Sequence, residues 1–450
     1  MKVVFINHMS SNYLGGSELS LLSVIDRWTD RDRNVIPIVV TPTPGGAIAK
    51  AIRSRGWRAE VIPYSGWAVF DQEGGAAQAR LRERDNARAT LRLIELLRES
   101  RPELVVTNTL VAPWGALAAA VVGIPHAWFV REFGDAAQGF HFPDGRDRAL
   151  RDLGDLSVTV FANSVAVRNE LKRFVPVEKL RVAYPWVDLD QVRSLADEPL
   201  TVPPFAENAG LRIAVVGRID GSKGQWRVIE SIGRLAALGL RVDACFVGET
   251  LHRGGDRILR RRAARLGVGD RIRFVGEQDN PFAFMAAAEL CVTPSDREAF
   301  GRATLEALAV GRPVLASNTG GSVELVGSGV NGELFDPDDI DDLVQLLAKF
   351  CLDPQRAESM RVAARLRADY LMTATLDVDD VIDTLEATRA APSAIVPEHR
   401  RFWLESLEKL AIVKAPKLLR LFAGQRRWGR RFSRVLRDPR PAVRRRLGRN

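Results

Sequence analysis

The sequence predicts an α/β protein with two lobes, each built around a doubly wound parallel sheet, and a basic amphipathic C-terminal tail. One reason is a recurring unit in which a buried-type strand is followed by a turn and an amphipathic helix. Another is a break in this pattern over residues 188–210, where acidic residues and three prolines gather. A third is the charge: residues 398–450 hold 17 of the 65 Lys and Arg residues but only 4 of the 56 Asp and Glu residues.

The first lobe is expected over residues 1–190. Lys2 to His8 has the pattern of a buried strand, and the glycine turn Gly15-Gly16 leads into an amphipathic helix. Further strands are expected at residues 35–40, 104–106, 127–130 and 158–161, with helices beginning near Ala47, Pro113 and Val165. Because strands alternate with helices, the sheet should be parallel.

After a linker over residues 191–210, a second lobe is expected over residues 211–372. Its expected strands span residues 211–216, 242–247, 272–275, 290–293 and 313–316, with a helix at 225–238. Ligands of such sheets bind at the carboxyl ends of the strands, so a cleft between the lobes is the expected site. Residues 338–390 are helical in period and should close the second lobe, with a closing helix in 373–397.

The composition limits the possible classes of protein. The three Cys residues are far apart and lie in apolar segments, as expected for reduced thiols in the cytoplasm. The five His residues show no metal-ligand spacing, so no metal site is expected. The first residues lack the pattern of a signal peptide, and no apolar run approaches the ~18 residues of a membrane span, so a cytoplasmic protein is expected.

The first chemical motif follows the strand at 211–216. Gly217-Arg218 and Lys223-Gly224 enclose a turn that leads into a helix. Glycines permit a tight turn, the helix N-terminus offers free N–H groups, and the two side chains add positive charge. The pattern indicates an anion-binding loop, although an ordinary strand-to-helix turn with solvated cations would look the same.

A second motif follows the strand at 290–293. Glu298 falls in a loop, and Glu306 lies two turns into a helix that starts near Gly301. Carboxylates accept hydrogen bonds from paired hydroxyls such as those of a ribose or hexose. Two glutamates alone would be ordinary surface residues, but beside the cationic loop they predict a sugar-nucleotide site.

Together these motifs resemble those of the retaining, family 4 type glycosyltransferases of the two-lobed GT-B fold, also called glycosyl transferases group 1. The resemblance covers about residues 1–390. The matching residues are Gly217-Arg218, Lys223-Gly224, Glu298 with Glu306, Gly311-x-Pro313-Val314, Gly320-Gly321-x-x-Glu324 and Asn331-Gly332. The resemblance implies two Rossmann-like lobes that face a cleft, with acceptor on the first and nucleotide sugar on the second.

The resemblance also implies residue roles. Arg218 and Lys223 would bind the donor diphosphate, and with Glu298, which meets the sugar, they form the expected catalytic set. Glu306 would take the ribose hydroxyls. The full donor-binding set that the resemblance implies is Gly15, Gly16, Arg218, Lys223, Glu298, Phe300, Gly301 and Glu306. No cofactor or metal is implied, and the substrate would be a UDP-, GDP- or ADP-sugar.

The acceptor side departs from the family pattern. Members of the family usually carry a His followed by an acidic residue after the strand at 127–130, whereas this chain has Arg131-Glu132. His126 starts that strand and should therefore be a structural residue at the opposite end of the sheet. Arg131 and Glu132 are the acceptor-side candidates, with Arg131 suited to an anionic acceptor or a phosphate.

The tail over residues 398–450 carries a net charge of +13, which leaves −4 for residues 1–397. Within residues 426–437, Trp428 and Phe432 share a helical face surrounded by Arg. This composition indicates binding to an anionic membrane, and we expect peripheral attachment to the inner face of the plasma membrane. Packing on the protein body and a disordered solubilising end are alternatives, whereas nucleic acid is not expected because no recognition module is found.

We therefore expect a metal-independent, retaining hexosyltransferase that acts on a glycan or lipid-linked saccharide. A sugar-nucleotide epimerase or a phosphorylase of the same fold would share the anion-binding loop. An inactive transferase-like protein that docks at a membrane is the alternative outside the enzymes.

Overall fold

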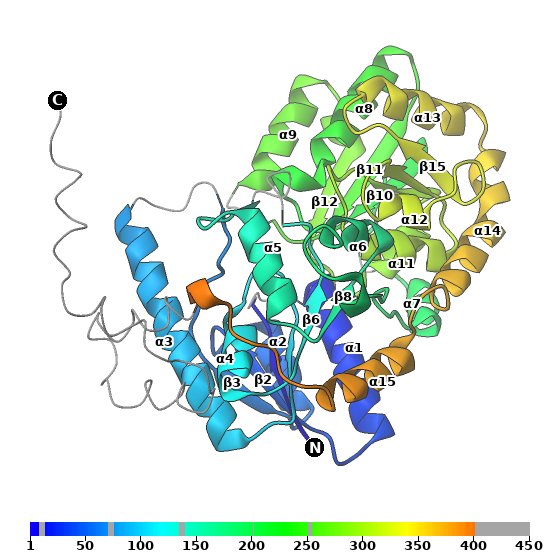
Figure 1. Ribbon diagram of the computed structural model, residues 1–450. Helices are drawn as coiled ribbons and strands as arrows, with labels where there is room; N and C mark the ends of the chain where they lie inside the picture. Colours follow the sequence, from blue (N-terminus) through cyan, green and yellow to red (C-terminus); the bar gives the residue numbers. More distant parts are fainter. Residues whose placement is uncertain (9–13, 71–75, 135–139, 201, 251–253, 401–450) are drawn as a thin grey trace, which may run out of the picture. The chain divides into compact units, whose positions relative to one another are not determined.

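The computed structural model describes residues 1–8, 14–70, 76–134, 140–200, 202–250 and 254–400 (Figure 1). Met1–Pro397 form one compact unit and Glu398–Asn450 another. The predicted membrane-binding tail belongs to the second unit and lies almost entirely outside the described residues. In the described part of the chain, none of the helices has the length and apolar character needed to span a bilayer.

The first sheet has seven parallel strands in the order β3-β2-β1-β5-β6-β8-β9. The strands are β1 (Lys2–Ile6), β2 (Ile36–Thr41), β3 (Arg58–Val61), β5 (Leu104–Thr107), β6 (His126–Val130), β8 (Thr159–Ala162) and β9 (Leu180–Val182). The associated helices are α1 (Gly16–Arg31), α2 (Gly46–Ser54), α3 (Ala76–Ser100), α4 (Trp114–Val122), α5 (Arg146–Asp155) and α6 (Val165–Leu171). A separate antiparallel pair joins β4 (Val69–Phe70) and β7 (Phe140–His141).

The second sheet has six parallel strands in the order β12-β11-β10-β13-β14-β15. The strands are β10 (Leu211–Val216), β11 (Val242–Val247), β12 (Ile272–Gly276), β13 (Leu290–Thr293), β14 (Val314–Ser317) and β15 (Gly332–Phe335). The helices are α8 (Gln225–Ala237), α9 (Gly255–Arg265), α10 (Phe282–Ala286), α11 (Arg302–Val310), α12 (Ser322–Leu325), α13 (Ile340–Leu352) and α14 (Gln355–Leu371). The expectation of two doubly wound parallel sheets is thus confirmed.

Both sheets place their first strand in the interior, with later strands added on each side. β1 lies between β2 and β5, and β10 lies between β11 and β13. In such sheets the loops that follow two neighbouring central strands lead to opposite sides of the sheet. A crevice therefore opens between these loops, at the carboxyl ends of the strands. This topology places the turn at Gly217 after β10 beside the loop of Glu298 after β13.

The expected linker is partly wrong. Residues 189–196 form helix α7 (Leu189–Ala196), capped by the Asp188 side chain, which accepts from the Gln191 N–H. Val187 and Val192 belong to the hydrophobic cluster formed by α11 and β14 of the second lobe. The prolines and acidic residues obscured the helical period, so the sequence analysis assigned residues 191–210 to a linker without a helix.

The expectation that residues 338–390 all close the second lobe is also wrong for their last part. Helix α15 (Val378–Arg389) packs its apolar face on α1 and β6 of the first lobe. Arg27 donates to Asp379 at 2.9 and 2.5 Å, and the Trp28 indole donates to Glu386 at 3.2 Å. The chain therefore crosses between the lobes twice, and Figure 1 shows α15 alongside α1.

One carboxylate of the second lobe caps a helix of the first. Glu324 on α12 accepts from the N–H groups of Val165 and Ala166 at 2.8 and 2.7 Å, at the start of α6. It also accepts from the Tyr184 hydroxyl at 2.8 Å. A negative charge at a helix N-terminus is favourable because free N–H groups point toward it. This contact gives a structural role to Glu324 of the Gly320-Gly321-x-x-Glu324 motif.

Replacing Glu324→Ala should lower the free energy of unfolding by about 2 kcal/mol, because three donors lose their acceptor. Urea denaturation followed by circular dichroism measures this loss. Glu358→Ala serves as the control, since Glu358 is exposed and pairs only with Arg361 three residues away. Equal stabilities for the two variants would contradict the capping role.

Candidate active site

The turn after β10 is shaped by glycines at positions where a side chain would not fit. Gly224 has φ +64°, and a Cβ atom placed there would lie 1.9 Å from the Pro294 carbonyl oxygen. The N–H of Asp296 donates to the Ser222 carbonyl at 2.9 Å. The loops after β10 and β13 are therefore pressed together along their backbones, which places their side chains at one site.

Asp220 organises the turn from within. Its Oδ1 accepts from the N–H groups of Ser222 and Lys223 at 3.0 and 3.2 Å, and its Oδ2 accepts from Arg218 Nε at 3.0 Å. Burial by itself would raise the pKa of Asp220, but the Ser222 hydroxyl and the Arg218 charge hold it below its ordinary value. Within the turn, the N–H groups of Ser222 and Lys223 are therefore not available to a ligand, because both donate to Asp220.

Arg218 and Lys223 remain the cations of the turn. The Arg218 side chain is held at Nε by Asp220 and is still 42% exposed. Lys223 Nζ donates to Glu298 Oε1 at 2.5 Å, and Ser295 Oγ donates to the same oxygen at 2.6 Å. The structure thus brings the two predicted motifs together, although they are 75 residues apart.

Glu298 is a largely buried carboxylate that stays ionised because of its partners. Burial alone would raise its pKa, but the charge and hydrogen bond of Lys223, helped by Ser295, hold the pKa below the ordinary value. An anion that approached Lys223 would meet a cation already fixed in place by this pair.

The loop of Glu298 is also fixed by the glycines that follow β14. A Cβ atom on Gly320 would lie 2.0 Å from the Glu298 carbonyl oxygen, and one on Gly321 would lie 2.6 Å from Phe300 Cα. The Gly321 N–H donates to the Glu298 carbonyl at 2.8 Å. Phe300 turns its buried ring toward Tyr184, with 5.0 Å between ring centres, and Gly301 begins α11 with φ +101°. Only the backbone of Phe300 and Gly301 therefore remains to meet a ligand.

Glu306 has a cation of its own that the sequence analysis missed. Arg302 Nε donates to Glu306 Oε1 at 2.7 Å, one helical turn away on α11. Burial raises the pKa of Glu306, and Arg302 opposes that rise only in part. Arg302 also donates to the Trp186 carbonyl at 3.3 Å, and its Cδ lies 3.4 Å from a Cβ atom placed on Gly16. Arg302 thus connects the predicted ribose carboxylate to the glycine turn of the first lobe.

The two acceptor-side candidates have different surroundings. Glu132 accepts from the N–H groups of Leu110 and Arg131 at 3.1 and 3.2 Å, so its carboxylate stabilises loops. Burial raises the pKa of Glu132, whereas these N–H groups and the Arg131 charge lower it. Arg131 Nε donates to Asn108 Oδ1 at 2.8 Å, and its guanidinium lies 5.2 Å from the centre of the Phe129 ring. Burial lowers the pKa of Arg131 to about 10, so it stays cationic at neutral pH.

His126 lies at the start of β6, away from the carboxyl edge. Its Nε2 is 2.8 Å from Thr107 Oγ1 and its Nδ1 is 3.3 Å from Ser157 Oγ. Burial lowers its pKa to about 3, so the ring is neutral. These contacts fit the structural role expected from the sequence.

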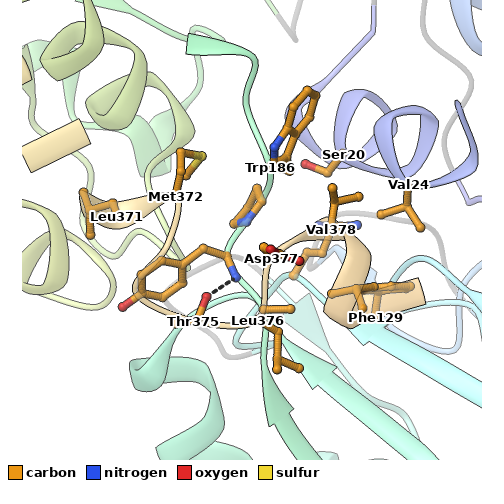
Figure 2. Close-up of a pocket in the computed structure, with 15 residues that line it drawn as sticks. Ser20, Val24, Phe129, Trp186, Leu371, Met372, Thr375, Leu376, Asp377 and Val378 are labelled. Atoms are coloured by element: carbon orange, nitrogen blue, oxygen red, sulfur yellow. Dashed lines mark hydrogen bonds between the residues drawn. The ribbon is translucent and has the colours of Figure 1, made fainter. Parts of the chain in front are cut away.

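A pocket lies where the chain passes between the lobes (Figure 2). Its wall combines Ser20 of α1, Phe129 and Trp186 with Met372 and Asp377 from the second crossing. The Tyr184 N–H donates to Thr375 Oγ1 at 3.1 Å, which ties the two crossings together. Arg131 also lines this pocket, so its charge lies toward the connection between the lobes.

Sequence reasoning missed Asp220, Ser295 and Arg302. The spacing of Arg302 and Glu306 by four residues on a helix would have predicted their ion pair. Asp220 before Gly221-Ser222 has the pattern of a side chain that caps its own turn. In the described part of the chain, no three His, Cys, Asp or Glu side chains gather as a metal site would require.

Two protein-family models match the chain. The model described as Glycosyltransferase Family 4 matches residues 14–191, and the model described as Glycosyl transferases group 1 matches residues 205–367. The first match runs from α1 to the start of α7, and the second runs from β10 into α14. The chain therefore belongs to the group 1 glycosyltransferases.

Curated relatives agree with this family at low identity. The D-inositol 3-phosphate glycosyltransferase of Mycolicibacterium paratuberculosis is 30% identical over 258 residues, which are 54% of this chain and 56% of the relative. The protein of the same name from Streptomyces griseus is 30% identical over 270 residues, which are 52% of this chain and 57% of that one. The chain thus spans little more than half the length of these relatives.

Solved structures show the same fold. Anabaena HepE in complex with UDP and glucose has a TM-score of 0.67 and 23% identity, and the match covers 87% of this chain and 100% of that one. A glycosyltransferase from Rickettsia africae has a TM-score of 0.64 and 18% identity, over 86% and 97% of the two chains. The two Rossmann-like lobes have the GT-B arrangement of these structures.

Replacing Lys223→Met should lower the free energy of unfolding by about 2 kcal/mol at neutral pH, because Glu298 becomes a buried carboxylate without its cation. In the native protein the pKa of Glu298 is depressed, so the pair contributes stability at neutral pH that is lost on acidification. In the variant, burial remains and the carboxyl protonates more readily, so the loss should shrink as the pH is lowered toward about 5. Urea denaturation at several pH values measures both effects.

A double variant Lys223→Met with Glu298→Gln should recover part of the lost stability, because no buried charge is left unpaired. Arg234→Met is the matched control, since Arg234 pairs with Asp341 at 2.5 Å on the surface. A pH-independent loss in Lys223→Met would contradict the proposed state of Glu298.

Proposed function

We propose that the protein is a retaining hexosyltransferase that moves a hexose from a nucleoside diphosphate sugar to a hydroxyl of a glycan or lipid-linked saccharide. The observation that carries this proposal is the 2.5 Å contact between Lys223 Nζ and Glu298 Oε1. It joins a cationic turn, suited to a diphosphate, to a carboxylate, suited to sugar hydroxyls, at one sheet edge.

The proposed reaction depends on charge placed before the substrate arrives. The acceptor oxygen attacks the anomeric carbon as the bond between that carbon and the diphosphate oxygen breaks. Arg218 and Lys223 stabilise the negative charge on the departing diphosphate, which takes the proton of the acceptor hydroxyl from the same face of the sugar. Fixed cations can supply this stabilisation without a metal ion.

Glu298 and Glu306 would orient the donor on either side of the diphosphate. Glu298 is held at Oε1 by Lys223 and Ser295, so its other oxygen is the one suited to a sugar hydroxyl. Glu306 is held at Oε1 by Arg302 and would present Oε2 to the ribose. In each glutamate, the contact at Oε1 fixes the carboxylate plane and therefore the direction in which Oε2 points.

The proposed donor is a UDP-sugar. Its support is the likeness in fold to a protein whose structure holds UDP and glucose. Calorimetric titration with UDP, GDP and ADP compares the three bases directly. If GDP or ADP bound more tightly than UDP, the proposal of a uridine base would be wrong. The proposed diphosphate site would be unaffected, because all three nucleotides carry a diphosphate.

Lys223→Ala should reduce nucleotide release in the presence of acceptor by about 100-fold or more, because one charge is lost from the leaving diphosphate. A coupled assay for free nucleoside diphosphate measures the rate. Lys50→Ala, which removes an exposed lysine of α2, is the control and should retain full turnover. Near-normal turnover in Lys223→Ala would refute the assignment, and an altered donor without a lengthened glycan would indicate an epimerase.

We also propose that residues 398–450 attach the protein to an anionic membrane surface. The support is their net charge of +13 together with the apolar residues Trp428 and Phe432. Each Lys or Arg near an anionic leaflet contributes about 1 kcal/mol, so several of them would hold the protein at the surface. A lipid-linked acceptor would then lie within reach.

A chain that ends at Pro397 should lose co-sedimentation with vesicles of phosphatidylglycerol and phosphatidylcholine, because it lacks the basic residues. Its affinity for the nucleotide should stay unchanged, since Met1–Pro397 form a compact unit. Raising the salt concentration should release the full chain. Equal sedimentation of both chains would exclude the tail as the attachment.

A further inference from the structure

A buried carboxylate of the first lobe has an oxygen without a hydrogen-bond partner. Glu18, in the first turn of α1, is 4% exposed, and among the described residues its Oε1 has no donor. Its Oε2 accepts from the neighbouring Ser17 hydroxyl at 2.9 Å and lies 2.7 Å from a Cβ atom placed on Gly15. An unmet hydrogen bond on a buried charged group is costly, so Glu18 is prepared for a donor that the protein does not supply.

The surroundings of Glu18 connect it to the acceptor-side residues. Asn108 Nδ2 donates to the Ser17 carbonyl at 3.0 Å, and Asn108 Oδ1 accepts from Arg131 Nε at 2.8 Å. The charge of Glu18 also raises the pKa of Arg131, against the larger effect of burial. Glu18, Asn108 and Arg131 therefore form one connected polar group at the carboxyl edge of β1, β5 and β6.

Two other side chains at this edge also have an unmet buried atom. Asn163, which follows β8, donates to the Arg131 carbonyl at 3.3 Å, and its Oδ1 has no partner among the residues that the structure describes. The same holds for Nδ1 of His8, which follows β1. Burial and the Arg218 charge lower the pKa of His8 to about 4, so its ring is neutral at neutral pH. Glu18 Oε1 and Asn163 Oδ1 can only accept, so a ligand that satisfies them must bring O–H or N–H donors.

The charges at this edge do not favour a phosphate. Arg131 is the cation of the group; the charges of Glu132 and Glu18 raise its pKa, and the charge of Arg302 lowers it. Arg302, which approaches Gly16 from the second lobe, is paired with Glu306 at 2.7 Å. A phosphorylated ligand would bring its negative charge close to the buried carboxylate of Glu18.

We infer that the acceptor is a neutral, hydroxyl-rich ring whose O–H groups donate to Glu18 and Asn163, and that Glu18 excludes phosphorylated acceptors. This inference rests on the proposed transferase function and specifies its acceptor class. It separates the chain from the curated relatives, whose name refers to an inositol 3-phosphate. It also replaces the sequence-based expectation that Arg131 serves an anionic acceptor.

The test compares matched neutral and phosphorylated rings. Saturation-transfer NMR, with UDP present, is recorded for myo-inositol against inositol 3-phosphate and for methyl α-glucoside against glucose 6-phosphate. In the native protein a neutral ring should receive saturation, and its phosphorylated counterpart should bind at least about 10-fold more weakly. Glu18→Gln keeps the shape of the side chain and removes its charge. This variant should lower the affinity for the neutral ring by about 10- to 100-fold.

Glu18→Gln should also reduce the ratio of the affinity for the neutral ring to the affinity for the phosphorylated ring. A purely structural role of Glu18 would leave this ratio unchanged. Its UDP affinity should stay unchanged. Asp30→Asn is the control, because Asp30 lies on the same helix but is exposed. It should change neither the affinity for the rings nor the affinity for UDP.

Three results would overturn the inference: tighter binding of a phosphorylated ring, no neutral ring bound while UDP binds, or an unchanged preference in Glu18→Gln. Failure of the proposed function would look different, because UDP itself would then not bind to the native protein.

Discussion

The ion pair between Lys223 and Glu298 is the contact on which the proposed donor site depends. It joins the loops after β10 and β13 and fixes the position of a cation and a carboxylate at once. Because both side chains are mostly buried, neither can move away without leaving the other charge uncompensated. The same pair keeps Glu298 ionised despite its burial. The proposed chemistry of the site and the stability of its loops therefore both depend on this ion pair.

Close contact between backbones makes this pair possible. Gly224 lies against Pro294, and Gly320 lies against the Glu298 carbonyl, at distances that no other residue could tolerate. These glycines bring three loops of one sheet edge within reach of the same ligand. Asp220 accepts from the N–H groups of Ser222 and Lys223 in its own turn, so we propose that the side-chain cations meet the phosphate.

The first lobe differs from the second in how its polar groups are balanced. At the proposed donor edge, Glu298 and Glu306 each have a cation, Lys223 and Arg302. At the proposed acceptor edge, Oε1 of Glu18 has no donor among the described residues, and Arg131 donates to Asn108. This difference suits a charged donor on one side and an uncharged, hydroxyl-rich acceptor on the other.

The sequence by itself determined the two sheets, the glycine turns, and the residues Arg218, Lys223, Glu298 and Glu306, because apolar period and backbone freedom are local properties. It missed β3 and β9, whose edge positions leave them half exposed and without an apolar run. Only the tertiary structure decided that α15 packs on the first lobe, that Arg302 approaches Gly16, and that Oε1 of the buried Glu18 has no donor among the described residues. Those outcomes depend on which distant segments meet, and burial sets the strength of each charge only after they have met.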